Sequence, residues 1–133
     1  MTSKVTYEGS LRTKARHIQS GNSIETDAPV DNGGKGEAFS PTDLVATALA
    51  SCMLTIMGIV AERNDVELKG TTAEVEKIMG VMPRQISKIK IKILFNKNFD
   101  KITKRKLESA ALTCPVSNSL NKNLEESIKF IYP

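Results

Sequence analysis

Apolar residues follow two different periods in the middle of the chain. Over residues 44–60 they occupy every face of a helix, which predicts a helix that is buried all round. Over residues 86–95 isoleucines alternate with lysines, which predicts a strand with one buried and one solvated face. A less regular alternation over residues 66–79 predicts a neighbouring strand. The middle of the chain is therefore expected to run from a long helix into a pair of strands.

Turn residues divide the N-terminal part into short strands. Strand-like segments at residues 4–7, 11–20 and 23–26 are separated by Glu8-Gly9-Ser10 and by Gly21-Asn22, and the second of these is a strong hairpin signal. These features predict a small antiparallel meander. The glycine-rich residues 31–36 match no phosphate-binding motif, so we interpret them as a mobile loop beside a site.

Local signals set the ends of the helices. Ser40 suits the N-cap of the long helix, Pro41 its first position and Asp43 an acidic capping box, and the helix should end near Asn64. Asp100 is expected to cap a second helix.

A short third helix is expected over residues 115–121, because Pro115 suits a helix start, and a closing strand over residues 127–132. The order of elements predicts an α+β protein, and 133 residues suit a single domain spanning residues 1–133.

Composition and charge narrow the function classes. The formal net charge is +4, and its lysines alternate with isoleucines rather than with aromatic residues, so nucleic-acid binding is expected to be absent. There is no Trp, and only four Phe and two Tyr, so an oligomer that completes the core is expected. No secretory signal is visible, and polar residues interrupt residues 44–60, so we expect a cytoplasmic protein without a membrane span.

Few residues could carry chemistry. The chain has one histidine, His17, and two cysteines far apart in sequence, which disfavours a Ser-His-Asp site and a metal site. Cys52 lies within the apolar helix, where burial would make its thiol inert unless a cation compensates. Arg12 and Arg16, on the second strand, are the best candidates for that cation. Cys114 precedes Pro115 and is expected to be a helix N-cap, a position that favours thiolate.

The cysteine motifs resemble those of the OsmC/Ohr family. Residues 39–44 read Phe-Ser-Pro-Thr-Asp-Leu, and residues 48–52 read Ala-Leu-Ala-Ser-Cys, so that Cys52 lies eleven residues after Pro41. The second motif, Cys-Pro-Val-Ser, begins at Cys114. The resemblance implies the family fold, with antiparallel sheets wrapped around a long, central buried helix in an intertwined homodimer.

The resemblance also implies an activity, that of a cysteine-based peroxidase that reduces organic hydroperoxides. Cys52 would attack the peroxide and become a sulfenic acid, and Cys114 would condense with it to a disulfide. A dithiol reductant, lipoyl or thioredoxin-like, would restore the thiols. No cofactor and no metal is implied.

The family pairs an early-strand arginine with a glutamate just after the helix-leading proline. Arg12 is our placement of this arginine, with Arg16 as the second choice. The glutamate position is Thr42 here, a departure from the family pattern, and Glu37 is the candidate to supply the carboxylate instead.

Two alternatives to the peroxidase stay open. One keeps the fold without the activity, as a dimeric protein that binds a small apolar ligand with Cys52 merely buried, and Thr42 favours it. The other is a basic nucleic-acid-binding module, which only the lysine-rich segment favours.

Overall fold

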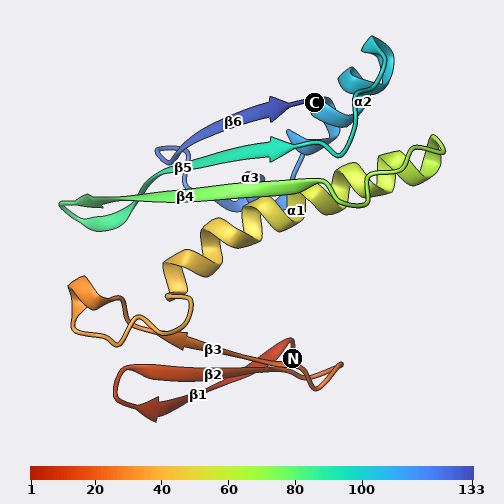
Figure 1. The fold of residues 1–133 in the computed structure, drawn as a ribbon. Coiled ribbons are helices and arrows are strands. Elements are labelled where there is room, and N and C mark those ends of the chain that lie inside the picture. The colour runs from red at the N-terminus through yellow and green to blue at the C-terminus, as the bar shows by residue number, and fades with distance from the viewer. The chain divides into compact units, whose positions relative to one another are not determined.

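A computed structural model describes all 133 residues and divides them into two compact units, Met1–Val45 and Ala46–Pro133. Figure 1 traces the elements of each unit along the chain. The elements have the α+β composition that the sequence predicts, with two three-stranded sheets.

The first unit contains the predicted antiparallel meander. Its strands β1 (Ser3–Gly9), β2 (Arg12–His17) and β3 (Ser23–Asp27) form a sheet in that order. The β1–β2 turn lies at Ser10 and Leu11, whose φ angles are both positive. Strand β2 ends three residues earlier than expected, because the backbone N–H of His17 donates to Asn22 and its carbonyl accepts from Gly21.

This sheet has one apolar and one polar face. Val5, Ala15 and Ile24 lie opposite one another in neighbouring strands, and Val5 and Ile24 are 60% and 52% exposed. The residues between them on each strand are mainly basic or hydroxyl side chains. A single chain therefore leaves the apolar face of its first sheet largely open to solvent.

The long helix starts with the predicted capping box. A short 3-10 turn (Val30–Asn32) precedes it, and α1 (Pro41–Arg63) ends within one residue of the expected position. The Ser40 N–H donates to the Asp43 carboxylate at 2.9 Å, and the Asp43 N–H donates to the Ser40 hydroxyl at 3.0 Å. These reciprocal bonds satisfy backbone groups that a helix start otherwise leaves unpaired.

The second unit contains a mixed sheet. Strands β4 (Thr72–Val81), β5 (Arg84–Leu94) and β6 (Glu125–Ile131) form it in that order. The β4–β5 pair is antiparallel, but β5 and β6 are parallel, so the expectation of antiparallel sheets is wrong here. The physical reason is that the chain between β5 and β6 crosses over through two helices, and such a crossover returns the chain in the same direction.

Helix α1 packs on one face of this sheet, as Figure 1 shows. The isoleucines of β5, Ile89, Ile91 and Ile93, are at most 1% exposed, which confirms the predicted alternation of buried and solvated faces. Each fully buried isoleucine contributes about 1.5–3 kcal/mol by its removal from water. On the helix side the core contains Leu49, Met53 and Met57.

The prediction that α1 is buried all round is wrong for a single chain. Val45, Ala48, Ser51, Thr55 and Ile59 are exposed and recur every three or four residues, so they form one stripe along the helix. By length and composition alone α1 could also cross a membrane, contrary to the sequence expectation, but the core helix of a soluble protein passes the same test. Its other stripe is buried against the sheet, which accounts for much of its apolar character.

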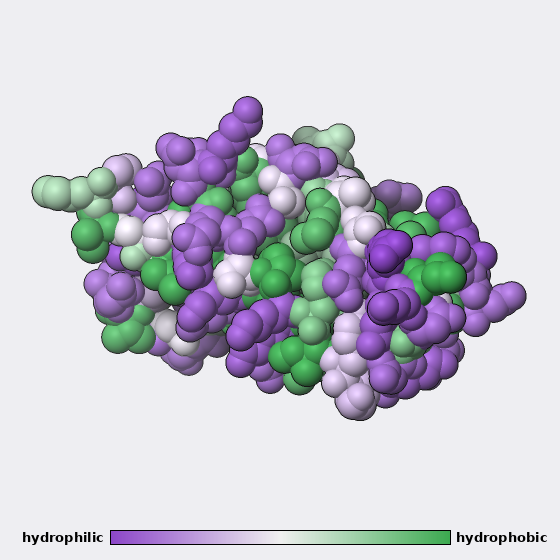
Figure 2. All heavy atoms as spheres, turned by 90° about the horizontal axis from the view of Figure 1, so that it is seen from above, coloured by the Kyte–Doolittle hydropathy of each residue, from purple (hydrophilic) through white to green (hydrophobic).

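Large apolar side chains are exposed elsewhere on the single chain too. Figure 2 shows hydrophobic residues among the hydrophilic ones that cover much of the visible face. Besides those already named, the exposed set includes Tyr7, Leu11, Val30, Phe39, Val75, Ile78, Ile102 and Leu112.

Helices α2 (Lys101–Ala111) and α3 (Pro115–Ser119) make the crossover. Asp100 caps α2 as predicted, accepting from the Thr103 N–H at 2.7 Å. The end of the sheet meets α2 through Tyr132, which stacks on Phe95 with ring centroids 4.4 Å apart and donates to Glu108 at 2.6 Å. These contacts hold the C-terminal end of α2 against the sheet, and thereby help to position Cys114, which follows it.

Candidate functional site

Cys52 lies near the middle of α1 and is partly exposed. It packs against the edge of the core of the second unit rather than inside it. Sequence reasoning favoured burial for this residue, because apolar neighbours flank it on the chain. The structure instead leaves Cys52 half-buried, next to Ser51 of the exposed stripe of α1.

Cys114 is placed beside Cys52 by the α2–α3 junction. It is completely buried, and its thiol lies 4.0 Å from the carbonyl oxygen of Leu49, three residues before Cys52 on α1. Cys52 packs against the core cluster that includes Cys114, and it helps to raise the pKa of Cys114. The structure therefore brings together two cysteines that are 62 positions apart in the sequence.

The charge state expected for Cys114 is wrong. Cys114 is the N-cap of α3, as predicted, and the N–H groups of Ser117 and Val116 do act to lower its pKa. Burial and the interaction with Cys52 outweigh them and raise the pKa of Cys114 above its usual value. A five-residue helix has too few aligned peptides to offset the cost of charging a buried thiol.

Ser117 and Glu126 form a polar anchor that sequence reasoning did not single out. The Ser117 hydroxyl contacts both carboxylate oxygens of Glu126, at 2.9 and 2.7 Å. Ser117 belongs to α3 and Glu126 to β6, so the bond ties the helix that begins at Cys114 to the sheet. The sequence analysis placed the closing strand at residues 127–132, whereas β6 begins at Glu125 and so includes Glu126.

Arg12 is held by a carboxylate in the first unit. Its guanidinium donates two bonds to Asp27, at 2.7 and 2.8 Å, and lies 3.6 Å from Glu25. Asp27 is 1% exposed, and the Arg12 side chain lowers the pKa of Asp27 below its usual value while Asp27 raises the pKa of Arg12. The planar fork of two parallel bonds fixes the direction of the guanidinium.

The carboxylate partner of Arg12 is therefore Asp27, which the sequence analysis missed. The hairpin at Gly21-Asn22 could have revealed it, because it places Arg12 directly opposite Asp27. Glu37 donates its backbone N–H to Asp27 at 3.1 Å and stabilises the charge on Arg12 only weakly through its own carboxylate. The hydroxyl of Thr42 lies 3.3 Å from that of Ser40.

Arg16 shares a strand and a face with Arg12 but has a different environment. It lies directly opposite Lys4 and Ser23, without a carboxylate partner. The structure thus groups Arg12 with Asp27, and Cys52 with Cys114, each pair within its own unit.

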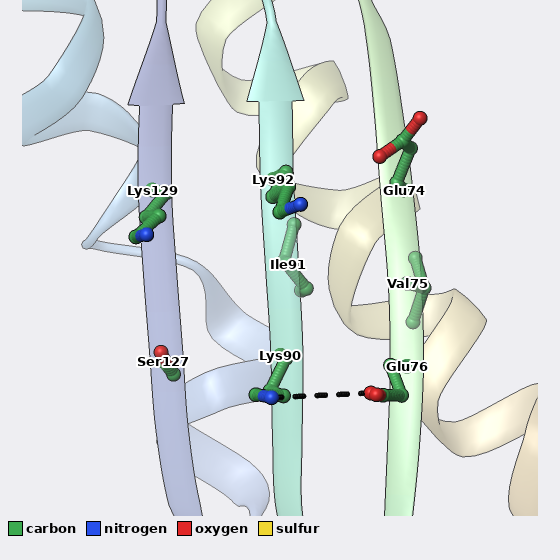
Figure 3. A pocket seen from close by; sticks show the side chains of 8 residues that line it. All are labelled: Glu74, Val75, Glu76, Lys90, Ile91, Lys92, Ser127 and Lys129. Carbon is green, nitrogen blue, oxygen red and sulfur yellow. Dashed lines mark ion pairs between the residues drawn. The ribbon is translucent and has the colours of Figure 1, made fainter.

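Other parts of the chain offer less for chemistry. No group of three or more His, Cys, Asp or Glu side chains lies close enough to hold a metal ion. A shallow groove of about 240 Å³ crosses the solvated face of the second sheet, where Glu76 pairs with Lys90 at 3.9 Å (Figure 3). Lys92 of β5 lines the same groove, with Glu74 of β4 opposite it on one side and Lys129 of β6 on the other.

Comparisons with known proteins agree with this architecture. Residues 34–129 match the family model described as OsmC-like protein. A structure from Psychrobacter arcticus, named for osmotic stress induction and a detoxification response, is 55% identical, with a TM-score of 0.95 over 98% of this chain and 95% of that one. No curated protein matches the chain.

Two more distant structures share the fold. The organic hydroperoxide resistance protein OsmC of Legionella pneumophila is 17% identical, with a TM-score of 0.76 over 98% of this chain and 97% of that one. An organic hydroperoxide resistance protein of Elizabethkingia anophelis is also 17% identical, with a TM-score of 0.76 over 100% and 97%. The chain belongs to the OsmC-like family.

The Arg12–Asp27 pair predicts a specific acid sensitivity. Because the folded-state pKa of Asp27 is lowered, its charge stabilises the fold above its ordinary pKa of about 3.9, and this contribution is lost as the pH falls through the lower folded value. We expect Asp27→Asn to lower the urea midpoint of unfolding at pH 7. The difference in midpoint from the unmodified protein should shrink below a pH of about 4.

Asp65→Asn is the matched control, because Asp65 is exposed. It should leave the midpoint nearly unchanged at both pH values. If the midpoint of Asp27→Asn differs from that of the unmodified protein by the same amount at every pH, the ion pair is not the cause of the lost stability.

The Ser117–Glu126 anchor predicts the accessibility of Cys114. Ser117→Ala removes a hydrogen bond to a charged group, worth about 1.5–3 kcal/mol, and loosens the start of α3. We expect faster alkylation of Cys114, measured by mass spectrometry on the folded protein. Ser119→Ala is the control, since the Ser119 hydroxyl bonds only within α3, to Pro115. Equal alkylation rates in the two variants would contradict the anchoring role.

Proposed function

We propose that the protein is a thiol peroxidase that reduces organic hydroperoxides to alcohols, with Cys52 as the nucleophile and Cys114 as the resolving cysteine. One observation carries the proposal: half-buried Cys52 packs against the cluster that contains fully buried Cys114. Membership of the OsmC-like family supports it, since two structures with the same fold are named organic hydroperoxide resistance proteins.

In the first step the Cys52 thiolate attacks one oxygen of the hydroperoxide. The O–O bond breaks as an S–O bond forms, the sulfur is oxidised to a sulfenic acid, and the alkoxide leaves and takes up a proton to give the alcohol. The exposure of Cys52 suits this role, because a peroxide must reach the sulfur.

In the second step the sulfur of Cys114 displaces the hydroxyl of the sulfenic acid. The Cys114 proton leaves with that hydroxyl as water, and an S–S bond forms between Cys52 and Cys114. A raised pKa suits Cys114, because a thiol that stays protonated until the sulfenic acid forms does not compete for peroxide.

A dithiol reductant of the lipoyl or thioredoxin-like kind then closes the cycle. One of its thiolates attacks the disulfide, its second thiol resolves the mixed disulfide, and two electrons return to the cysteines. Attack at the Cys52 sulfur is favoured, because Cys114 is buried. Such reductants act in a reducing compartment, so a cytoplasmic location is part of the proposal.

Arg12 is our candidate for the activating cation. Its support is geometric: Asp27 holds the guanidinium by two bonds, whereas Arg16, the second choice, has no such partner. Glu37 supports the same pair from its backbone rather than through its carboxylate. In place of the family's glutamate after Pro41 this chain has Thr42, and this departure favours the alternative of a ligand-binding protein without peroxidase activity.

We also propose that the protein is a homodimer. The exposed stripe of α1 and the open apolar face of the first sheet support it, because a soluble monomer rarely leaves such surfaces uncovered. Ile59 lies on the α1 stripe and is 42% exposed in the single chain.

The peroxidase proposal predicts distinct behaviour of the two cysteines. With one equivalent of cumene hydroperoxide, intact mass should fall by two hydrogens, and peptide mapping should find a Cys52–Cys114 link within one chain. Cys52→Ser should take up no oxygen. Cys114→Ser should stop at one oxidation per chain and fail to turn over with dithiol.

Both thiols remaining free after peroxide treatment would overturn the activity and leave the ligand-binding alternative. Oxidation of Cys114 in the Cys52→Ser variant, at the rate seen for Cys52 in the intact protein, would reverse the assigned roles.

The dimer proposal predicts that lysine substitutions at two exposed isoleucines, Ile59 and Ile102, have different effects on the oligomeric state. Sedimentation velocity should find a dimer for the unmodified protein and for Ile102→Lys, because Ile102 is on α2 and is 69% exposed. Ile59→Lys should give folded monomer, because it would place a charge in a buried interface. A monomeric unmodified protein would refute the dimer.

A further inference from the structure

The polar face of the first sheet contains an open, shallow cavity, lined by exposed residues, that includes neither cysteine nor Arg12. Its volume is about 440 Å³, and five residues line it: Lys4, Thr6, Lys14, Arg16 and Ser23. All five belong to the first unit, and three are cations and two carry hydroxyl groups. Every lining side chain can therefore donate a hydrogen bond to an anion.

Strand register explains why the cations converge. Arg16 of β2 lies directly opposite Lys4 of β1 on one side and Ser23 of β3 on the other. Lys14 lies opposite Thr6 and, two residues from Arg16, on the same face of β2. Like charges directly opposite in a sheet are destabilising, so a bound anion would relieve the repulsion between Lys4 and Arg16.

No carboxylate lines the cavity, although Glu25 lies on the same face of the sheet. Glu25 lies opposite Lys14, but its carboxylate is 3.6 Å from the guanidinium of Arg12, which also binds Asp27. No ion pair joins Lys4, Lys14 or Arg16 to an acidic side chain.

The groove on the second sheet is a useful comparison, because glutamates line it together with lysines. There Glu74 and Glu76 lie opposite Lys92 and Lys90, Lys90 is paired with Glu76, and Lys92 also lies opposite Lys129 (Figure 3). Both faces are exposed and lysine-rich, yet only the cavity of the first sheet is lined by cations without a carboxylate.

We propose that this cavity binds the phosphate group of a small molecule. Two lysines and an arginine match a doubly charged oxyanion, and the hydroxyls of Thr6 and Ser23 supply neutral donors. The volume exceeds that of a single phosphate, which leaves room for the organic part of the ligand. No aromatic side chain lines the cavity, so the base stacking that supports single-stranded nucleic-acid binding is missing.

Inorganic phosphate is the probe for the test. Titrated into the ¹⁵N-labelled full chain at low ionic strength, it should saturate with a dissociation constant of roughly 1 mM and shift the amide signals of the five lining residues. Lys14→Gln/Arg16→Gln should weaken binding at least about tenfold, because two charge-assisted hydrogen bonds are lost.

Lys90→Gln/Lys92→Gln is the matched control, since it removes the same net charge from the other sheet. It should change the affinity less than about twofold, because neither Lys90 nor Lys92 lines the cavity. Equal weakening in both variants, or shifts that do not saturate, would overturn the site. A single-stranded oligonucleotide that binds far more tightly than phosphate, with equal loss in both variants, would overturn the small-molecule assignment.

Discussion

Packing of α1 onto the isoleucine row of β5 fixes the position of both cysteines in the second unit. The helix brings Leu49, Met53 and Met57 to that row, and Cys52 then lies at the edge of the buried stripe. The same sheet determines the crossover, because β6 can lie parallel to β5 only if the chain returns through α2 and α3. That return places Cys114 against the α1 turn that precedes Cys52.

Most elements could be predicted from the sequence, because their signals are local. The Ser40–Asp43 capping box, the Asp100 cap and the alternation of β5 depend on neighbouring residues, and all three are confirmed. The parallel pairing of β6 could not be predicted in this way, since strand direction follows from where the crossover helices pack. The exposed stripe of α1 was missed for a related reason: composition says that a helix is apolar, but not which of its faces meets the sheet.

Charge states were harder to predict than positions. Cys114 is the N-cap that Pro115 indicates, but its pKa depends on burial, which sequence does not show. The partner of Arg12 depends on the register of β2 and β3. Asp27 is fifteen residues away in the sequence, and the pairing of the two strands places it directly opposite Arg12. In both cases the secondary structure around the residue was predicted correctly, but its charge state or charged partner was not. The reason is that burial and charged neighbours far away in the sequence determine these properties.

The polar faces of the two sheets differ in how their charged side chains are paired. This difference indicates which cations could bind a ligand. On the second sheet, glutamates of β4 face Lys90 and Lys92 of β5, although Lys92 also faces Lys129 of β6. On the first sheet, Arg12 is compensated and held by Asp27, while Arg16, only four residues later, faces Lys4. One strand therefore presents a fixed cation at one end and an uncompensated cluster at the other. A fixed cation suits the activation of a thiolate, whereas an uncompensated cluster suits a bound anion, so Arg12 and Arg16 are expected to serve different ligands.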